Sequence, residues 1–137
     1  MSTKDEREAL QEFSERYALA RSPVVDDIER RVIGAVWGAN GFTTRAQADE
    51  LGERLHLAPG KRLLDIGAGR GWPSLYLARR TGCQVVVTDL PLDGLRIAMR
   101  RAARERMDLV ACVAASARDL PFKSGCFDAI VHTDVLC

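Results

Sequence analysis

The sequence predicts an α/β protein in which a parallel sheet follows an N-terminal helical cap. Short apolar runs alternate with amphipathic helical segments in the second part of the chain, a pattern typical of parallel sheets with right-handed crossovers. The 137 residues suffice for about one domain, and a content of 47% hydrophobic and 28% charged residues is ordinary for a globular protein. We therefore divide the chain into a helical cap, residues 1–58, and a sheet-forming part, residues 59–137.

Two helices are predicted in the first part of the cap. Residues 4–20 place Leu10, Phe13 and Tyr17 on one face. Ser22-Pro23 predicts the start of the next helix, because serine is a good N-cap and proline suits the first turn. We expect this helix to end near Trp37-Gly38. Its apolar stripe consists of Ile28, Val32, Ala35 and Val36.

A turn and a third helix complete the cap. Residues 38–41 form the turn, since glycine and asparagine tolerate left-handed dihedral angles. Thr44 and Gln47 have the spacing of a capping box, which predicts a helix start at that point. The segment 58–60 closes the helix. Its predicted buried face consists of Ala48, Leu51 and Leu55.

The sheet-forming part contains four predicted strands. They span residues 62–66, 84–88, 109–114 and 127–132, and each is a short apolar run. Helices are predicted over 72–80, with Pro73 in the first turn, and over 92–106. The second of these has Leu95, Ala98 and Ala102 inward and Arg96, Arg100 and Arg104 outward. A loop containing residues 120–122 precedes the fourth strand.

Composition excludes several classes of function. The formal net charge of +1 gives no electrostatic reason to expect nucleic acid or a membrane surface as a partner. The arginines at 96, 100, 101, 104 and 106 have no aromatic residues among them, which favours a solvated helix face. No apolar run approaches the ~20 residues that span a bilayer, and the charged N-terminus lacks a secretory signal. We therefore expect a cytoplasmic protein.

The cysteines point to the same compartment and to no metal. No pair has CxxC spacing, and no Cys/His group has the spacing of a zinc site. We interpret them as reduced thiols. The four residues are Cys83, Cys112, Cys126 and Cys137.

The strongest chemical signal is the segment Leu64-Asp65-Ile66-Gly67-Ala68-Gly69-Arg70-Gly71. A buried strand leads into alternating glycines and then into a helix, so the backbone can approach a ligand closely at the carboxyl end of the sheet. A dinucleotide fingerprint would read G-x-G-x-x-G, but Trp72 stands at its third glycine. The pattern is G-x-G-x-G instead. Asp89 ends the second strand, where a carboxylate can accept both hydroxyls of a ribose.

These motifs resemble those of class I S-adenosylmethionine-dependent methyltransferases. LLDIGAGRGW is similar to their first motif and VVVTDL to their second. SARDLPFKSGCFDAIVHTDVL is similar to the family's D-A-x-x-L-P-F-x-x-x-x-F-D-x-V. The likeness covers residues 61–137 and implies a Rossmann-like sheet. That family's strand order is 3-2-1-4-5-7-6, of which this chain supplies an incomplete 3-2-1-4.

The resemblance also implies site residues. Gly67, Gly69 and Gly71, with Ala68 between them, would line the methionine and ribose part of S-adenosylmethionine. Asp65 would orient its amino-acid end. Asp89 would bind the ribose hydroxyls, with Leu90 against the adenine. The adenine edge would meet Ser116 and Ala117, and the methionine moiety would meet His132 and Thr133. Ser116 departs from the family, which often has aspartate there, and a hydroxyl accepts a hydrogen bond more weakly than a carboxylate.

Each assignment has a plainer alternative. The glycine loop would then be only a strand-to-helix turn, Asp89 a solvated carboxylate at a strand end, and Asp65 a helix cap or loop anchor. His132 would be a general base near the methyl group or merely a pocket residue, and we favour the latter. An aromatic lid over the sulfonium would involve Trp37 or Phe42, whereas Tyr17 fits better in the helix-packing core. No catalytic residue and no metal site follow from the sequence.

The expected function is methyl transfer from S-adenosylmethionine to a small-molecule acceptor, since a helical cap rather than a basic cleft precedes the sheet. One alternative is a non-catalytic remnant that binds the cofactor weakly or not at all. Another is a nicotinamide-dependent oxidoreductase, against which Trp72 argues. We expect the chain to be truncated after its fourth strand. That strand would then be an edge prone to self-association or to pairing with a partner chain.

Overall fold

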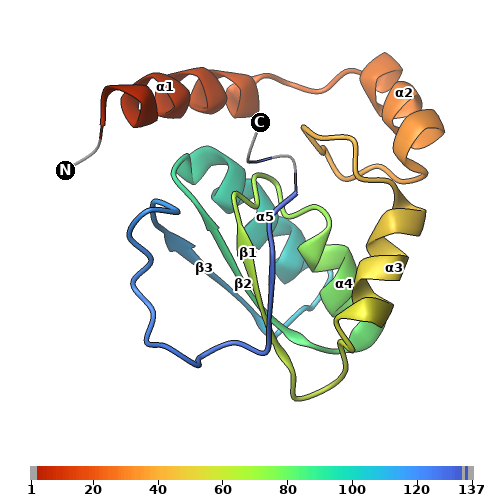
Figure 1. Cartoon of the computed structure of the whole chain (residues 1–137). Helices are drawn as coiled ribbons and strands as arrows, with labels where there is room; N and C mark the ends of the chain where they lie inside the picture. The colour runs from red at the N-terminus through yellow and green to blue at the C-terminus, as the bar shows by residue number, and fades with distance from the viewer. Residues whose placement is uncertain (1–2, 134, 136–137) are drawn as a thin grey trace.

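The computed structural model describes residues 3–133 and 135, and Figure 1 shows the arrangement of its elements. The helices are α1 (Lys4–Ala18), α2 (Pro23–Ile33), α3 (Arg45–Arg54), α4 (Ser74–Thr81) and α5 (Leu92–Arg104). The strands are β1 (Arg62–Ile66), β2 (Gln84–Asp89), β3 (Val110–Ala114) and β4 (Ala129–Val131). The predicted α/β class and the order of elements are confirmed.

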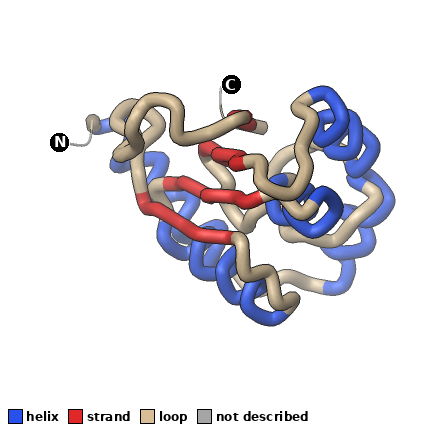
Figure 2. Tube along the Cα trace, turned by 90° about the horizontal axis from the view of Figure 1, so that it is seen from below, coloured by secondary structure: helices blue, strands red, loops and turns tan. Residues whose placement is uncertain are grey.

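The four strands form one parallel sheet in the predicted order β3-β2-β1-β4. They lie side by side in one layer in Figure 2. Asp65 of β1 is opposite Val87 of β2 and Val131 of β4, so the carboxyl ends of the strands meet at one edge. The loop after β1 and the residues that end β2 and follow β4 therefore share that edge. This is where a parallel sheet binds ligands.

The main core lies between the sheet and α4 and α5. Leu63, Val85 and Val87 point from the strands into the same cluster as Leu75 of α4 and Leu95 of α5. All five are at most 1% exposed, and each side chain contributes roughly 1.5–3 kcal/mol by burial. On α5, Ala98 and Ala102 face inward while Arg96, Arg100 and Arg104 are exposed, as predicted. The α5 apolar stripe thus fixes the sheet on which the site is built.

The cap helices start where the sequence predicts but end earlier. Thr3 and Thr44 each form a complete capping box, and Ser22 caps α2. The first helix ends at Ala18 instead of residue 20. The prediction that the second helix runs to Trp37-Gly38 is wrong, because Gly34 adopts a left-handed conformation and its N–H bonds back to the carbonyl of Arg30.

The buried face of α2 also differs from the predicted stripe. Ile28 and Val32 are 55% and 54% exposed, whereas Glu29 and Ile33 are buried. Glu29 faces inward because its carboxylate accepts hydrogen bonds from three N–H groups of the turn that follows the helix. On α3, Ala48 is fully buried and Leu51 and Leu55 are half-buried.

Trp37 joins the cap to the rest of the protein. It is 4% exposed and packs against the rings of Trp72 and Tyr76, with centroids 5.7 and 6.3 Å away. The guanidinium of Arg101 lies 4.2 Å from the Trp37 ring and donates to the carbonyl of Val36. Arg101 therefore differs from the solvated arginines predicted on this helix.

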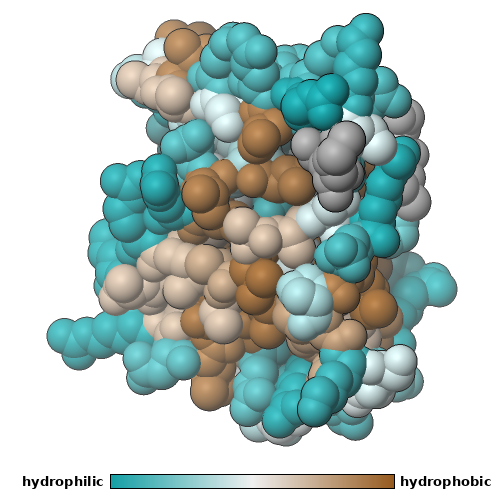
Figure 3. All heavy atoms as spheres, turned by 90° about the vertical axis from the view of Figure 1, so that its left-hand side faces the viewer, coloured by the Kyte–Doolittle hydropathy of each residue, from teal (hydrophilic) through white to brown (hydrophobic). Residues whose placement is uncertain are grey.

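The opposite side of the sheet is less covered. The fourth strand is shorter than the predicted 127–132, with Ala129 and Val131 buried and Ile130 54% exposed. Figure 3 shows the side of the molecule that carries β3 and the 115–128 loop, where apolar residues gather within a hydrophilic rim. Among the described residues, Ala111 and Cys112 of β3 are also exposed. Both edge strands thus present apolar surface.

Three further properties concern the described part of the chain. No helix there has the length and apolarity to cross a membrane. Over the same residues, no group of three or more His, Cys, Asp and Glu side chains is arranged to hold a metal. Cys83, Cys112 and Cys126 are free thiols, and Cys137 lies outside the described residues.

Candidate functional site

The loop between β1 and α4 bends at its three glycines. Gly67, Gly69 and Gly71 all have positive φ, at 71°, 52° and 91°. The loop is held by two backbone bonds, from Ala68 N–H to the Thr88 carbonyl (2.9 Å) and from Gly71 N–H to the Ala68 carbonyl (2.8 Å). A side chain at Gly71 would collide with Leu75 of α4, so that glycine serves close packing. Gly67 and Gly69 have no side chain, so other groups can approach the backbone closely at this edge of the sheet.

Asp89 lies beside this loop at the end of β2. Its Oδ2 accepts from the N–H of Gly69 and its Oδ1 from the N–H of Leu90, both at 2.8 Å. Burial raises the pKa of Asp89, although these two hydrogen bonds act in the opposite direction. A carboxylate has roughly four acceptor positions, so about half remain for a ligand. Among the described residues, Asp89 forms no ion pair. This arrangement suits the two hydroxyls of a ribose.

The side chains of Tyr17 and Val135 lie against Gly69 and Gly67. A Cβ on Gly69 would be 2.6 Å from the hydroxyl of Tyr17, and a Cβ on Gly67 would collide with Val135. Tyr17 is buried as expected, but against the glycine loop rather than only between helices. Burial and the charge of Asp89 raise the pKa of Tyr17 to about 12. A ligand on this loop therefore displaces Tyr17 and Val135 or packs against them.

The structure separates the other two aromatic candidates. Trp37 belongs to the core, so the structure does not place it as a lid. Phe42 is 78% exposed. The aromatic residue that covers the glycine loop is Tyr17, which the sequence favoured as a core residue. Helical periodicity placed Tyr17 on the apolar face of α1, but it did not indicate which surface that face meets.

Asp65 lies beneath the loop instead of on its surface. It is 1% exposed, and the hydroxyl of Ser74 at the start of α4 donates to its Oδ2 at 2.5 Å. Burial raises the pKa of Asp65 to about 7, with the charge of Asp89 adding to the effect. The Asp65–Ser74 bond ties β1 to α4 across the loop. Asp65 thus supports the loop from below.

The loop after β3 provides the neighbouring surface. Its Ala115 N–H donates to the Asp89 carbonyl at 3.1 Å, which places residues 115–118 next to the end of β2. The hydroxyl of Ser116 donates to Glu6 of α1 at 2.5 Å and accepts from the N–H of Arg118 at 3.1 Å. Ala117 is exposed. The partnership of Ser116 with α1 was not visible in the sequence.

His132 and Thr133 follow β4 at the same edge. The register places Val131 opposite Asp65, so these two residues run alongside Ile66 and the first glycine of the loop. His132 is exposed and Thr133 is half-buried. The sequence-predicted residues of β1, β2, β3 and β4 therefore meet at one edge of the sheet.

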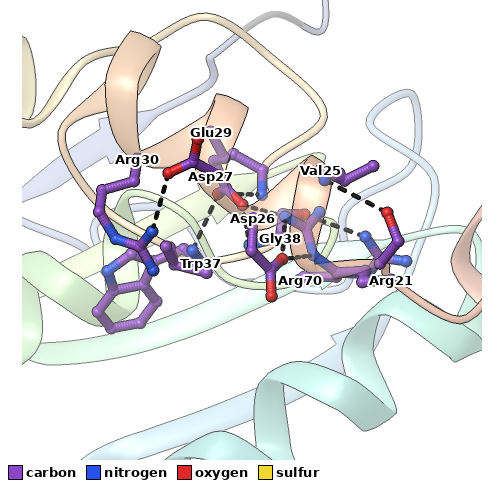
Figure 4. A network of polar contacts seen from close by, with 12 residues as sticks. Arg21, Val25, Asp26, Asp27, Glu29, Arg30, Trp37, Gly38 and Arg70 are labelled. Carbon is purple, nitrogen blue, oxygen red and sulfur yellow. Dashed lines mark hydrogen bonds and ion pairs between the residues drawn. The ribbon is translucent and has the colours of Figure 1, made fainter.

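A second polar network lies in the cap (Figure 4). Glu29 Oε1 accepts from the N–H groups of Trp37 (2.9 Å) and Ala39 (3.0 Å), and its Oε2 accepts from Gly38 (3.2 Å) and pairs with Arg21. Arg21 also pairs with Asp26 at 2.8 Å. The carboxylate of Glu29 is thus fully partnered within the chain.

Arg70 joins this network to the glycine loop. It is 7% exposed and donates to the carbonyls of Gly38 (3.3 Å) and Tyr17 (3.2 Å), while its guanidinium lies 5.3 Å from the Tyr17 ring. Sequence reasoning missed Arg70 and Glu29. The available signal was a charged residue within the glycine motif and a carboxylate between apolar helix positions.

Comparison with known proteins identifies the same region. A family model described as a methyltransferase domain matches residues 64–137. Methyltransferase GfsG from Streptomyces halstedii is 36% identical over 83 residues, which are 60% of this chain and 30% of that protein. Erythromycin 3''-O-methyltransferase from Saccharopolyspora erythraea is 34% identical over 132 residues, which are 88% of this chain and 43% of that protein. The chain spans less than half the length of these curated relatives.

A solved structure shares the arrangement of elements. Geranyl diphosphate C-methyltransferase from Streptomyces coelicolor, in complex with Mg²⁺, geranyl diphosphate and S-adenosyl-L-homocysteine, has a TM-score of 0.72 and 23% identity. The likeness covers 96% of this chain and 54% of that chain. Because the identity is low, it supports the fold alone, cap included.

Proposed function

The chain belongs to the class I S-adenosylmethionine-dependent methyltransferases, and on that premise we propose that its glycine loop and Asp89 bind S-adenosylmethionine for methyl transfer to a small molecule. The observation that carries the proposal is that the glycine loop and the Asp89 carboxylate lie together at one edge of the sheet. Gly67 and Gly69 lie beside Asp89, and their backbone is covered by the side chains of Val135 and Tyr17. Asp89 has no ion-pair partner in the described chain and keeps about half of its acceptor positions for a sugar.

The residues divide the ligand between them. The proposed methionine end lies over Gly67, Ala68 and Gly69, with His132 and Thr133, which follow β4, at its side. Asp89 holds the ribose, Leu90 borders the base, and Ser116 and Ala117 meet its edge. Asp65 and Gly71 shape the loop from within. These residues would hold the donor in one orientation, which lowers the entropic barrier of a two-substrate reaction.

Methyl transfer requires few catalytic groups from this part of the chain. When bound, S-adenosylmethionine supplies an electrophilic methyl group on its sulfonium. Tyr17 and the α1 helix cover the glycine loop and would limit access of water to it. We assign no general base, because His132 is exposed and no acceptor fixes its role.

The acceptor is proposed as a small molecule. One curated relative is named as an erythromycin 3''-O-methyltransferase, and erythromycin is a small molecule. The net charge of +1 gives no electrostatic reason to expect nucleic acid as the acceptor. In this proposal residues 1–58 form the cap over the cofactor and residues 59–137 form the cofactor-binding part.

Calorimetric titration of the chain with S-adenosylhomocysteine tests the proposal. We expect one binding site per chain and severalfold weaker binding for Asp89→Asn, which removes the charge but keeps the shape. NADH should give no heat, which separates the nicotinamide alternative. A protein that unfolds cooperatively yet does not bind S-adenosylhomocysteine would contradict the proposal and favour the non-catalytic remnant.

We also propose self-association through the β4 edge. In the described sheet β4 is an edge strand, whose unpaired backbone groups favour pairing between chains, and the 54% exposed side chain of Ile130 adds apolar surface on the face beside that edge. Sedimentation velocity should show concentration-dependent oligomers that Ile130→Lys suppresses. A monodisperse monomer at high concentration would overturn this part.

A further inference from the structure

The N-terminal end of α1 lies over the loop that follows β3, next to the proposed sugar site. If Asp89 holds the ribose, as the proposed function requires, the base extends toward one of the neighbouring strands. Val135 lies against the glycine loop on the β1 side, and β3 is the neighbour of β2 on its other side, so we place the base on the β3 side. Ala115 is bonded to the Asp89 carbonyl, which brings the hydroxyl of Ser116 to that side. In this placement the base would meet Ser116.

A serine hydroxyl is by itself ambiguous, because it can donate or accept. In this structure the hydroxyl hydrogen of Ser116 is already used in a hydrogen bond. Ser116 Oγ donates to Glu6 Oε1 at 2.5 Å, a length typical of a hydroxyl bonded to a carboxylate. It also accepts from the N–H of Arg118 at 3.1 Å. What remains on the oxygen is one acceptor position.

Glu6 is itself held in place from several directions. Its Oε2 accepts from the N–H of Thr3 at 2.8 Å, which completes the capping box of α1. The far end of the same helix is fixed by Arg70, which donates to the carbonyl of Tyr17. Hydrogen bonding from Ser116 and from the Thr3 backbone lowers the pKa of Glu6, so it stays ionised at neutral pH. Both of its oxygens are therefore acceptors.

We propose that Glu6 is a positioning residue that fixes Ser116 as a hydrogen-bond acceptor and so makes the site select a 6-amino purine. An adenine amino group donates to the remaining acceptor position on Ser116. A 6-oxo purine presents an acceptor there and is disfavoured. The α1 carboxylate, 110 residues away in sequence, thereby compensates for the missing aspartate at position 116.

Substitution of Glu6 by glutamine reverses the direction of the hydrogen bond with Ser116 and changes the shape of the side chain little. Glutamine still satisfies the capping box through its single oxygen. Its amide nitrogen then faces Ser116 as a donor, which frees the serine hydrogen to point at the ligand. The control is Glu8→Gln, because Glu8 is exposed on the same helix and forms a surface ion pair with Lys4 at 3.5 Å.

The experiment measures binding of S-adenosylhomocysteine and of S-inosylhomocysteine, its 6-oxo analogue, to the full chain by calorimetry. The unmodified protein should prefer the 6-amino ligand by about tenfold or more. Glu6→Gln should reduce this ratio to about threefold or less, and Glu8→Gln should leave it unchanged. The double variant Glu6→Gln/Ser116→Asp should restore the ratio, which a merely structural role of Glu6 would not.

The outcomes separate this inference from the proposed function. If the folded protein binds neither ligand, the proposed function fails and the inference fails with it. If it binds S-adenosylhomocysteine and Glu6→Gln leaves the ratio intact, only the inference is overturned. A Glu6→Gln variant that binds both ligands more tightly at an unchanged ratio would show that Glu6 closes the site, and would also overturn it.

Discussion

Two carboxylates in this protein each organise a glycine-containing turn, and they do so differently. Glu29 in the cap receives three backbone N–H groups, from Trp37, Gly38 and Ala39, and also pairs with Arg21. Asp89 at the sheet edge receives two, from Gly69 and Leu90, and no ion pair within the described residues. Glu29 is 7% exposed, whereas Asp89 is half-buried.

The difference teaches how to tell a structural carboxylate from a binding one. The chain satisfies every acceptor position of Glu29, so the residue contributes to stability and has nothing left for a ligand. Asp89 is partly desolvated and incompletely partnered, a state that is costly unless a ligand completes it. On this reasoning the two residues should respond to substitution in opposite ways.

The largest expected effect is on stability at Glu29. Glu29→Ala leaves three backbone N–H groups without their acceptor and removes one of the two carboxylate partners of Arg21. We expect a loss of about 3–5 kcal/mol in the free energy of unfolding. Urea denaturation provides the measurement. Glu12→Ala, which removes an exposed pair with Arg16, should cost about 0.5 kcal/mol or less. A loss below about 1 kcal/mol for Glu29→Ala would remove the distinction drawn above.

A third carboxylate, Asp65, sharpens the comparison through pH. Its pKa in the folded protein is about 7, above the ordinary value of 3.8, so the folded state binds the extra proton between these values. Stability therefore falls as pH rises from about 4 to about 7 and then levels off. Asp65→Asn lacks this titration. We expect its unfolding free energy, relative to the unmodified protein, to rise by roughly 2–4 kcal/mol from pH 4 to pH 8. A flat difference across that range would contradict the burial argument.

At Asp89 the expected loss is in binding. Asp89→Ala should weaken S-adenosylhomocysteine by about a hundredfold, or roughly 2.7 kcal/mol, because the ribose hydroxyls lose a charged acceptor. Its free energy of unfolding should change by only about 1 kcal/mol, since removing a partly desolvated charge offsets the loss of two hydrogen bonds. Calorimetry and urea denaturation of the same sample measure both quantities. A variant that lost stability but kept its affinity would reverse the roles assigned to Asp89 and Glu29.

The smallest expected effect concerns the loop backbone. Gly69→Ala introduces a Cβ 2.6 Å from the Tyr17 hydroxyl at a φ of +52° and should cost about 1–2 kcal/mol of stability together with severalfold affinity. Gly60→Ala is the matched control, because its φ is +88° and no atom lies within 4 Å of the added Cβ. Gly60→Ala should lose stability alone. Equal affinities for the two variants would place the ligand away from Gly69.

The sequence predicted what local chemistry determines. The glycines at 67, 69 and 71 and the caps at Thr44 and Ser22 depend on backbone geometry within a few residues, and the structure has them as expected. The order of the strands followed from family resemblance. By contrast, the contacts of Tyr17 with Gly69 and of Glu6 with Ser116 join segments far apart in sequence. Helical periodicity placed Tyr17 on the apolar face of α1, but it could not indicate that this face contacts Gly69.

Sequence periodicity also failed to predict the buried face of α2. Ile28 and Val32 fit the apolar periodicity of a buried stripe, yet they are exposed while Glu29 is buried. A set of hydrogen bonds with the following turn outweighs the hydrophobic pattern at this helix. Because those bonds depend on how residues 37–39 fold back on α2, the pattern alone could not predict them.

The most direct measurement of the central assignment is an amide chemical-shift map of the chain during titration with S-adenosylhomocysteine. We expect the largest shifts at the N–H groups of Gly67, Gly69 and Leu90, and little change at Trp37, Gly38 and Ala39, whose acceptor is Glu29. Saturable shifts at the first set and quiet signals at the second would support the ligand site at Asp89. Shifts that gather in the cap turn, or none at the glycines of a folded protein, would contradict it.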